Sequence, residues 1–192
     1  MQPRYIPFVQ QPYCCVPACI QTVLYKNNIP LKSQEEIGNA LGLRVKLERA
    51  HLFENVSTEE PATGVWGTQV GNPDYDINEK FDDLGIPMKV EIKHIKEIGS
   101  PDELREMLQE IENEDGDALV CFRYGSLWDD GSSSGHVNVF DQIVDGKIRL
   151  VDPAIEVPKF RMVEVDKLYK AMVEHEAAVS PGLWLFSPKI TN

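Results

Sequence analysis

The chain has 192 residues and a formal net charge of −12 at pH 7, from 19 Lys and Arg against 31 Asp and Glu. This length suits one domain, residues 1–192, that can bury a core without disulfides or a structural metal. The acidic excess argues against binding to nucleic acid or to an anionic membrane surface, because both depend on clustered Lys and Arg. No apolar run approaches the ~18 residues that a membrane-spanning helix needs.

The cysteines and the first residues indicate a reducing environment. Residues 1–7 contain no long apolar stretch and no small-residue cleavage site, so we expect no signal peptide and a cytoplasmic location. The four cysteines are then expected to be free thiols: Cys14, Cys15, Cys19 and Cys121. No second Cys or His pair follows the first three at ligand spacing, so the sequence predicts no metal site and no cofactor.

The first half of the chain is predicted to be helical. One helix begins just after Cys15 and ends near residue 27, with Pro17 in its first turn. Its buried face repeats at helical spacing through Val16, Cys19, Ile20, Val23 and Leu24. Ser33 and Glu36 form a capping box that opens a second helix, to about residue 41. Residues 44–75 show little periodicity and are expected to be irregular, and Asp76 is expected to cap a short helix through residue 84.

Strands dominate the second half. They are predicted over residues 87–93, 118–124, 136–144, 147–152 and 183–186. Ser100 and Pro101 predict a helix start, and Asp166 is expected to cap a final helix to about residue 174. Residues 125–135 are expected to form a polar loop. Helices followed by mainly antiparallel strands with further helices attached define an α+β fold.

Cys15 lies where a nucleophilic thiol would be placed. A helix N-terminus carries roughly +0.5 of a charge and unpaired N–H groups, which favour a thiolate and can stabilise an oxyanion. Cys19 on the apolar face and Cys121 within a strand fit small buried residues better. Cys14 is the competing thiol. On position alone, Cys15 could equally be an inert, half-buried thiol.

His136 is the histidine best placed to act as a base, because it follows the polar loop and begins a strand. The other three fit surface positions better: His51, His94 and His175. Asp152 ends the neighbouring strand and could orient the imidazole of His136.

The turn at Asp145-Gly146 decides whether these two side chains share a face of the hairpin. A two-residue turn would leave His136 and Asp152 on opposite faces. A three-residue turn with a bulge would pair Ile143 with Lys147 and put both side chains on one face. A catalytic pair therefore requires the odd-length turn.

Two short segments resemble the C39-like, papain-like cysteine peptidases. Residues 14–20, Cys-Cys-Val-Pro-Ala-Cys-Ile, resemble the Asp-Cys-Gly-Pro-Ala segment that opens the catalytic helix of that family. Gly135-His136-Val137 and Val151-Asp152-Pro153-Ala154 resemble its Gly-His strand and Asp-Pro hairpin end, in the order of the family. The resemblance implies a papain-like α+β fold that covers both ends of the chain.

The resemblance also implies the roles of four residues. Cys15 would be the nucleophile, His136 the general base and Asp152 its orienting partner. Gln10, rather than Gln11, would donate a side-chain hydrogen bond to the oxyanion. The implied activity is that of a cysteine peptidase or related thiol hydrolase, which cleaves an amide bond through an acyl-enzyme. Residues 125–135 are the candidate lid over the cleft.

The sequence leaves alternatives to hydrolysis open. An acyltransferase on the same scaffold would pass the acyl group to an amine or thiol. A catalytically inactive peptide-binding module is the second alternative, which Cys14 and Val16 favour because the family has Asp and Gly there. The expected partner is a peptide or small amide substrate, and the acidic composition favours a neutral or cationic one. The oligomeric state is left unknown.

Overall fold

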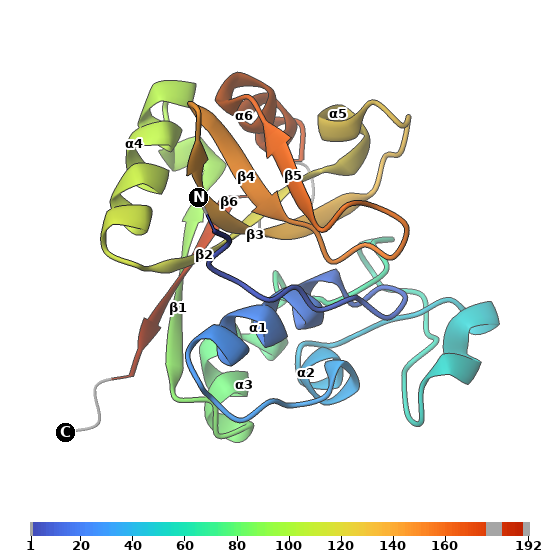
Figure 1. Ribbon diagram of the computed structural model, residues 1–192. Helices are drawn as coiled ribbons and strands as arrows, with labels where there is room; N and C mark the ends of the chain where they lie inside the picture. The colour runs from blue at the N-terminus through green and yellow to red at the C-terminus, as the bar shows by residue number, and fades with distance from the viewer. Residues whose placement is uncertain (1, 176–181, 190–192) are drawn as a thin grey trace.

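In the part of the chain that the structure describes, six strands form one sheet (Figure 1). The computed structural model describes residues 2–175 and 182–189. The strand order is β1-β6-β2-β3-β4-β5, and each neighbouring pair is antiparallel. The strands are β1 (Met88–His94), β2 (Asp117–Arg123), β3 (Gly135–Val144), β4 (Lys147–Val151), β5 (Phe160–Val163) and β6 (Gly182–Pro188). The predicted α+β class is confirmed.

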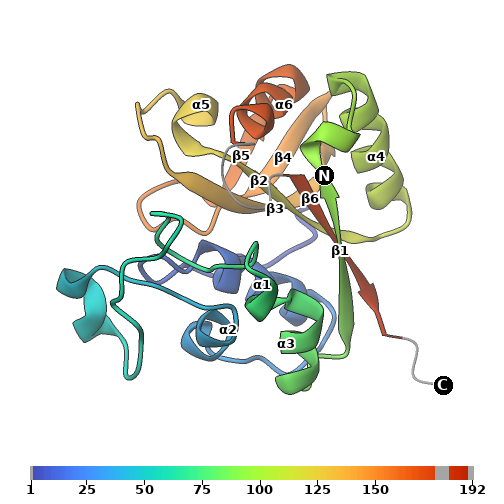
Figure 2. The same cartoon turned by 180° about the vertical axis from the view of Figure 1, so that it is seen from behind.

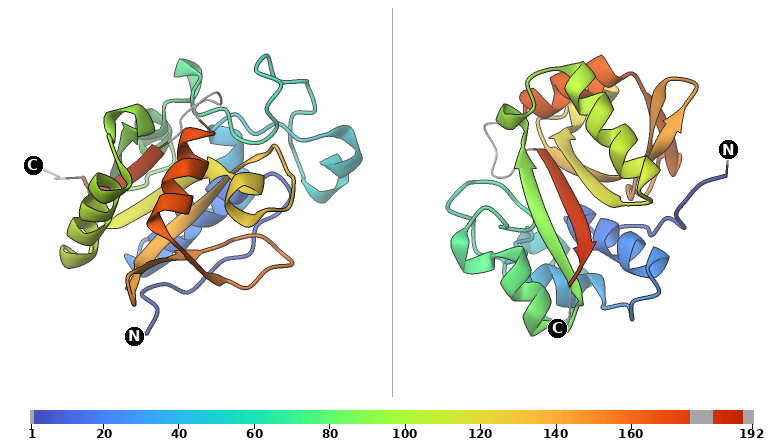
Figure 3. Two further views of the ribbon diagram at one scale, coloured as in Figure 1. Left: turned by 90° about the horizontal axis from the view of Figure 1, so that it is seen from above. Right: turned by 90° about the vertical axis from the view of Figure 1, so that its left-hand side faces the viewer.

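Helices cover both faces of the sheet. They are α1 (Cys15–Lys26), α2 (Gln34–Ala40), α3 (Ile77–Asp83), α4 (Pro101–Asn113), α5 (Tyr124–Trp128) and α6 (Val165–Val173). The first three lie on one side and the last three on the other (Figures 1 and 2). Figure 3 shows β1 and β6 side by side as a long pair at one edge of the sheet. None of the helices in the described ranges is long and apolar enough to cross a bilayer.

Each face of the sheet has its own hydrophobic core. Along β2, Leu119 and Cys121 belong to the cluster that contains α1, whereas Val120 and Phe122 belong to the cluster on the opposite side. This period of two is the geometry of a strand that is buried on both faces.

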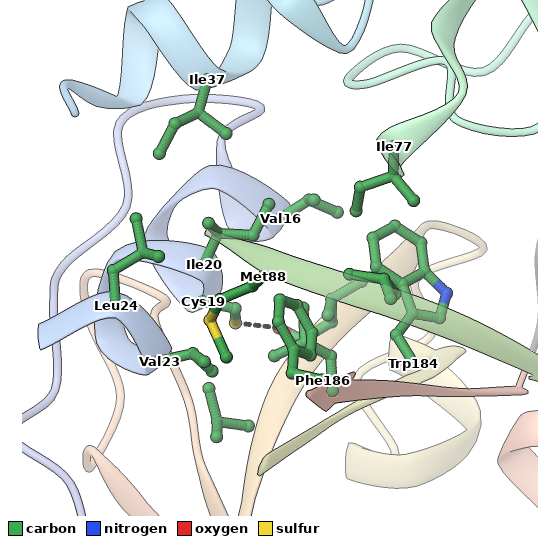
Figure 4. Close-up of a cluster of buried hydrophobic side chains, with 14 of the residues drawn as sticks. Val16, Cys19, Ile20, Val23, Leu24, Ile37, Ile77, Met88, Trp184 and Phe186 are labelled. Atoms are coloured by element: carbon green, nitrogen blue, oxygen red, sulfur yellow. Dashed lines mark hydrogen bonds between the residues drawn. The ribbon is translucent and has the colours of Figure 1, made fainter. Parts of the chain in front are cut away.

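The apolar face predicted for α1 is the contact between that helix and the sheet. The predicted side chains are buried in one cluster with Met88, Trp184 and Phe186 of the sheet (Figure 4). Pro17 lies in the first turn, where a missing N–H costs no helical hydrogen bond. The head of α1 is therefore held rigidly against the sheet.

Other local signals also act as predicted. The Ser33 hydroxyl accepts from Glu36 N–H and the Glu36 carboxylate accepts from Ser33 N–H, which is the expected capping box of α2. Asp76 caps α3 and Ser100 caps α4. Residues 44–75 contain only the short 3-10 helices η1 (Leu47–Leu52) and η2 (Pro73–Tyr75), and a third, η3 (Ile95–Glu97), follows β1.

The polar loop predicted over residues 125–135 is wrong at its start. This part of the chain forms α5, whose Leu127 side chain is fully buried. The Trp128 ring packs under the guanidinium of Arg161, 3.3 Å from the ring centroid. These tertiary contacts stabilise a helical turn that the Gly- and Ser-rich sequence does not itself favour.

The start of the final helix is also predicted wrongly. α6 begins at Val165 with Glu164 as its N-cap, so Asp166 lies in the first turn instead of capping it. Val165 is buried in the core on that face of the sheet, which explains the earlier start. β5 was not predicted, because only Val163 among its four residues is buried.

The turn between β3 and β4 differs in length from the predicted one. Asp145 and Gly146, at φ 49° and 79°, form a two-residue turn, and Val144 pairs with Lys147. The odd-length turn expected here is therefore wrong. A bulge between Phe140 and Gln142 supplies the extra residue instead, and the register beyond it is the one that the predicted longer turn would have produced.

Asp141 is the bulged residue, and its buried carboxylate is fully paired. Its Oδ2 accepts from Arg149 Nε at 2.5 Å, and its Oδ1 accepts from the Arg4 backbone N–H at 2.8 Å. The Arg4 guanidinium also donates to the Asp141 carbonyl oxygen at 2.8 Å. A carboxylate without partners would be costly to bury, so these bonds hold the bulge at this position.

Removing the buried carboxylate should destabilise the protein far more than breaking an exposed ion pair on the same hairpin. We expect Asp141→Ala to lower the free energy of unfolding by about 3–5 kcal/mol, because Arg149 would lose its buried charge partner. Lys147→Ala is the matched control, because its pair with Glu164 is about half exposed and contributes roughly 0–1 kcal/mol. Urea unfolding measures both. Equal losses would contradict this account of the bulge.

Candidate active site

A cleft of about 710 Å³ opens beside the N-terminus of α1. Its lining combines the N-terminal arm with segments from both halves of the chain. The lining residues are Gln10, Tyr13, Cys15, Val16, Lys46, residues 63–70, Cys121, residues 133–137, His175 and Trp184. The cleft therefore brings Cys15, Gln10 and His136 to one site.

A tight turn delivers Cys15 to the head of α1. The Cys14 N–H donates to the Gln11 carbonyl at 3.0 Å, which closes a turn through Pro12 and Tyr13. Tyr13 has a φ of 65°, a left-handed conformation that this position of a turn usually reserves for Gly or Asn. Strained backbone of this kind persists where the surroundings enforce it. The turn directs Cys15 into the cleft and Cys14 into the interior.

Burial separates Cys15 from the other three thiols. Cys15 is half-buried, whereas Cys14, Cys19 and Cys121 are buried. Cys14 packs with Leu43 and Val45, and this burial raises the pKa of its thiol to about 12. Burial also raises the pKa of the Cys19 and Cys121 thiols, and Cys19 Sγ lies 3.3 Å from the Val137 carbonyl oxygen. Cys15 is therefore the accessible thiol among the four.

His136 is bound to Asp152. The Nε2 atom of His136 lies 2.9 Å from Asp152 Oδ1, and both side chains are buried. Since Nε2 is engaged, Nδ1 is the ring nitrogen left for Cys15. Burial lowers the pKa of His136, but the hydrogen bonds with Asp152 and with Cys15 outweigh it and raise the pKa to about 9. The imidazole therefore carries a proton at neutral pH.

The rings around His136 fix its orientation. Tyr124 and Phe122 meet it edge-on, with centroids 4.9 Å and 5.8 Å away. Phe122 is also its cross-strand partner on β2. The imidazole is thus packed on the sheet as well as hydrogen-bonded.

Asp152 is fully buried and its carboxylate has three partners. Besides His136, Oδ1 accepts from the Ala154 N–H at 3.0 Å, and Oδ2 accepts from Arg161 Nη1 at 3.0 Å. Burial raises the pKa of Asp152, but the bonds from His136, Ala154 and Arg161 outweigh burial, and the pKa is lowered. The carboxylate therefore stays charged in the interior.

Arg161 is a site residue that the sequence analysis missed. It comes from β5, and its guanidinium also donates to the Tyr124 hydroxyl at 3.1 Å while it stacks on Trp128. An Arg three residues after Pro158 carries no local signal of this role. Only the pairing of β5 with β4 brings it to Asp152.

Gln10 and Gln11 lie in different surroundings. The Gln10 N–H donates to the Pro153 carbonyl at 2.9 Å, so this residue is anchored next to Asp152. Within the described ranges its buried Oε1 has no hydrogen-bond partner, and its amide nitrogen is the side-chain atom that can donate into the cleft. Gln11 is exposed and its N–H donates to Gln34, away from the cleft.

One wall of the cleft has no signal in the sequence. Residues 63–70 line it although they have no helical or strand periodicity. Arg44 bridges both Ser57 and Gly67, and these backbone bonds hold the segment in place. His175, which was assigned to the surface, lines the cleft as well.

Comparison with known proteins identifies a shared fold. No protein-family model and no curated protein matches this sequence. The solved structures that match include one from Bacillus anthracis, described as a "putative C39-like peptidase". The TM-score is 0.61 at 12% sequence identity, and the match covers 98% of this chain and 99% of that one. At this identity the likeness shows the fold alone.

The protonation of His136 should depend on Asp152. We expect a titration midpoint near pH 9 for the His136 ring in the wild-type protein. In Asp152→Asn the midpoint should fall by at least about one unit, because burial then opposes the charged form with less compensation. NMR of the ring protons measures this, and the resonances of the exposed His51 serve as a reference. An unchanged midpoint would show that Asp152 does not hold the proton on the ring.

The raised pKa of His136 should also make the free energy of unfolding depend on pH. A folded-state pKa of about 9, above the usual 6.5, means that protonated His136 stabilises the fold below about pH 6.5 and that this stabilisation is lost as pH rises through 9. We therefore expect unfolding free energy to decline more steeply between pH 7 and pH 9.5 in the wild type than in His136→Gln. Parallel declines in urea titrations would contradict the raised pKa.

Proposed function

We propose that this protein is a cysteine peptidase or related thiol hydrolase of the C39-like, papain-like kind. The observation that carries the proposal is the convergence of three groups in one cleft, with a fourth buried directly beneath them. The four are an accessible thiol at a helix N-terminus, a protonated imidazole, its buried carboxylate partner and an amide donor. Nucleophilic hydrolysis of an amide needs these same components.

In the proposed reaction, Cys15 Sγ attacks the amide carbonyl carbon. The proton that leaves the thiol is held on His136 Nδ1, which transfers it to the amine as the C–N bond breaks. Water then attacks the thioester, gives a proton to His136 and releases the acid, and the proton returns to the sulfur. Asp152 keeps the ring in one tautomer and compensates its charge.

The oxyanion has two candidate donors. In the first turn of α1, Pro17 has no N–H and the Ala18 N–H is bonded to the Cys14 carbonyl. Within the described residues the Cys15 N–H makes no hydrogen bond and Cys14 provides no side-chain cap, so the Cys15 N–H can donate to the oxyanion. The Gln10 amide nitrogen is the second donor. Two preorganised donors of this kind each contribute on the order of 10²-fold or more to the rate.

The departures from the family motif are compatible with activity. Cys14 is buried beneath the turn, so it does not compete for substrate. Val16 borders the cleft, but it is only 5% exposed and packs in the core beneath α1 (Figure 4). Crowding of the incoming carbonyl by Val16 is therefore small.

The shared fold supports the same proposal. The Bacillus anthracis structure with a peptidase description matches nearly the whole of both chains. We also propose that residues 1–192 act as one papain-like domain, because a single sheet joins elements from both halves of the chain. Of the predicted lid, residues 125–135, the first part belongs to α5, and residues 129–135 are proposed as the lid because Ser133 and Ser134 line the cleft. The cytoplasmic location is proposed on the sequence alone.

Alkylation tests which thiol is reactive. We expect iodoacetamide at neutral pH to label one site in the native protein and Cys15→Ala to abolish that labelling, because the other thiols are buried. Cys14→Ala is the matched control and should label like the wild type. Intact-protein mass spectrometry counts the adducts. Labelling that persists in Cys15→Ala and disappears in Cys14→Ala would transfer the role to Cys14.

Turnover tests the reaction itself. A library of peptides and acyl esters should contain substrates that the wild type cleaves, with kcat roughly 10³-fold or more lower in Cys15→Ala and in His136→Ala. Mass spectrometry of the products, with added amines or thiols, separates hydrolysis from acyl transfer. Binding of peptides without any cleavage, together with a normal thiol pH profile, would favour an inactive binding module and overturn the proposal.

A further inference from the structure

The cleft differs in charge from the rest of the protein. Asp and Glu make up 31 of the 192 residues, so a lining of 21 residues drawn at this frequency would contain about three. None of the described residues that line the cleft is Asp or Glu. The expectation of a neutral or cationic substrate came from the composition of the whole chain. The cleft does not share that composition.

The charges that do reach the cleft are positive. Lys46 lines it, and within the described ranges its ammonium forms no ion pair and no side-chain hydrogen bond. The protonated ring of His136 lies in the same cleft. Its counter-charge, Asp152, is fully buried beneath it and is shared with Arg161. A substrate in the cleft therefore meets the Lys46 ammonium and the His136 ring, whereas the Asp152 carboxylate is shielded from it by burial.

His175 adds a donor on the side of β3. An added Cβ at Gly135 would lie 2.3 Å from His175 Cε1, so the two residues are in close contact directly before His136. Burial and then the positive charge of Arg123 lower the pKa of His175. Its ring is therefore neutral at pH 7, and a neutral imidazole still offers one N–H donor. Ser133 and Ser134 contribute hydroxyl groups to the same wall.

We propose that this cleft selects an acidic peptide, in which a side-chain carboxylate pairs with the exposed Lys46 at the cleft wall. The inference deepens the proposed hydrolase function and names its substrate class. Low-dielectric walls strengthen the field of a few cations in a cleft. An unpaired Lys is also available to a substrate without breaking a bond within the protein. The surrounding acidic surface repels anionic peptides in general, so discrimination arises inside the cleft.

The test measures peptide binding to Cys15→Ala, which cannot turn substrate over. Peptide sublibraries differ at one fixed position, which is Glu, Gln or Lys. We expect Glu to bind roughly 5-fold more tightly than its uncharged isostere Gln at one or two positions, which is the range of one partly exposed ion pair, and Lys to bind more weakly than Gln. Fluorescence polarisation measures the binding.

Two further variants in the Cys15→Ala background assign the effect. Lys46→Gln should reduce the Glu/Gln ratio to about one. Lys89→Gln makes the same charge change on the exposed side of β1, outside the cleft, and should leave the ratio unchanged. Equal binding of Glu and Gln sublibraries, preference for Lys, no binding by any sublibrary, or a ratio that Lys46→Gln does not change would each overturn the proposal.

The peptide-binding test of the acidic substrate and the turnover test of the hydrolase can each succeed or fail on its own. A Glu preference without cleavage by the wild type would retain the acidic ligand and reject the hydrolase. Cleavage by the wild type without a Glu preference would retain the hydrolase and reject the acidic substrate.

Discussion

The buried carboxylate of Asp152 is the constraint on which the candidate site depends. An unpaired charge in the interior would cost several kcal/mol, so the fold must bring partners to it. These partners come from separate elements: His136 from β3, Arg161 from β5 and the Ala154 N–H from the segment between β4 and β5. Satisfying one carboxylate thus fixes three parts of the chain relative to one another. The position and charge of the imidazole follow from that.

The buried carboxylate of Asp141 makes the pairing of His136 with Asp152 possible. Asp141 occupies the bulge of β3 and is paired with Arg149 and with the N-terminal arm through Arg4. The bulge shifts the register by one residue, and a shift by one residue moves a side chain to the other face of a sheet. His136 and Asp152 share a face because of it. The electrostatics of Asp141 therefore determine the geometry of a pair whose members lie five and eleven residues away along the chain.

Burial and charge divide the roles within the cleft. Four thiols lie in the chain, but the strained turn at Tyr13 exposes only Cys15 and directs Cys14 inward. The hydrogen bond with Asp152 keeps the His136 ring protonated although the ring is buried. The group beside the Cys15 sulfur is therefore a cation. Lys46 and the absence of acidic residues among the described lining extend this positive character across the cleft. An acidic protein thus presents a locally basic site.

The sequence by itself determined the features that depend on near neighbours in the chain. The caps at Ser33, Asp76 and Ser100, the apolar face of α1, Pro17 in its first turn and the strand β2 are local, and they were predicted correctly. Cys15, His136, Asp152 and Gln10 were selected by local position and by resemblance, and the structure places the side chains of all four at one site. Only the tertiary structure decided the bulge at Asp141, the partnership of Arg161, the wall at residues 63–70 and the places of Lys46 and His175. These depend on contacts between residues far apart in sequence, where loop closure and the pairing of buried charges, rather than local preference, determine the outcome.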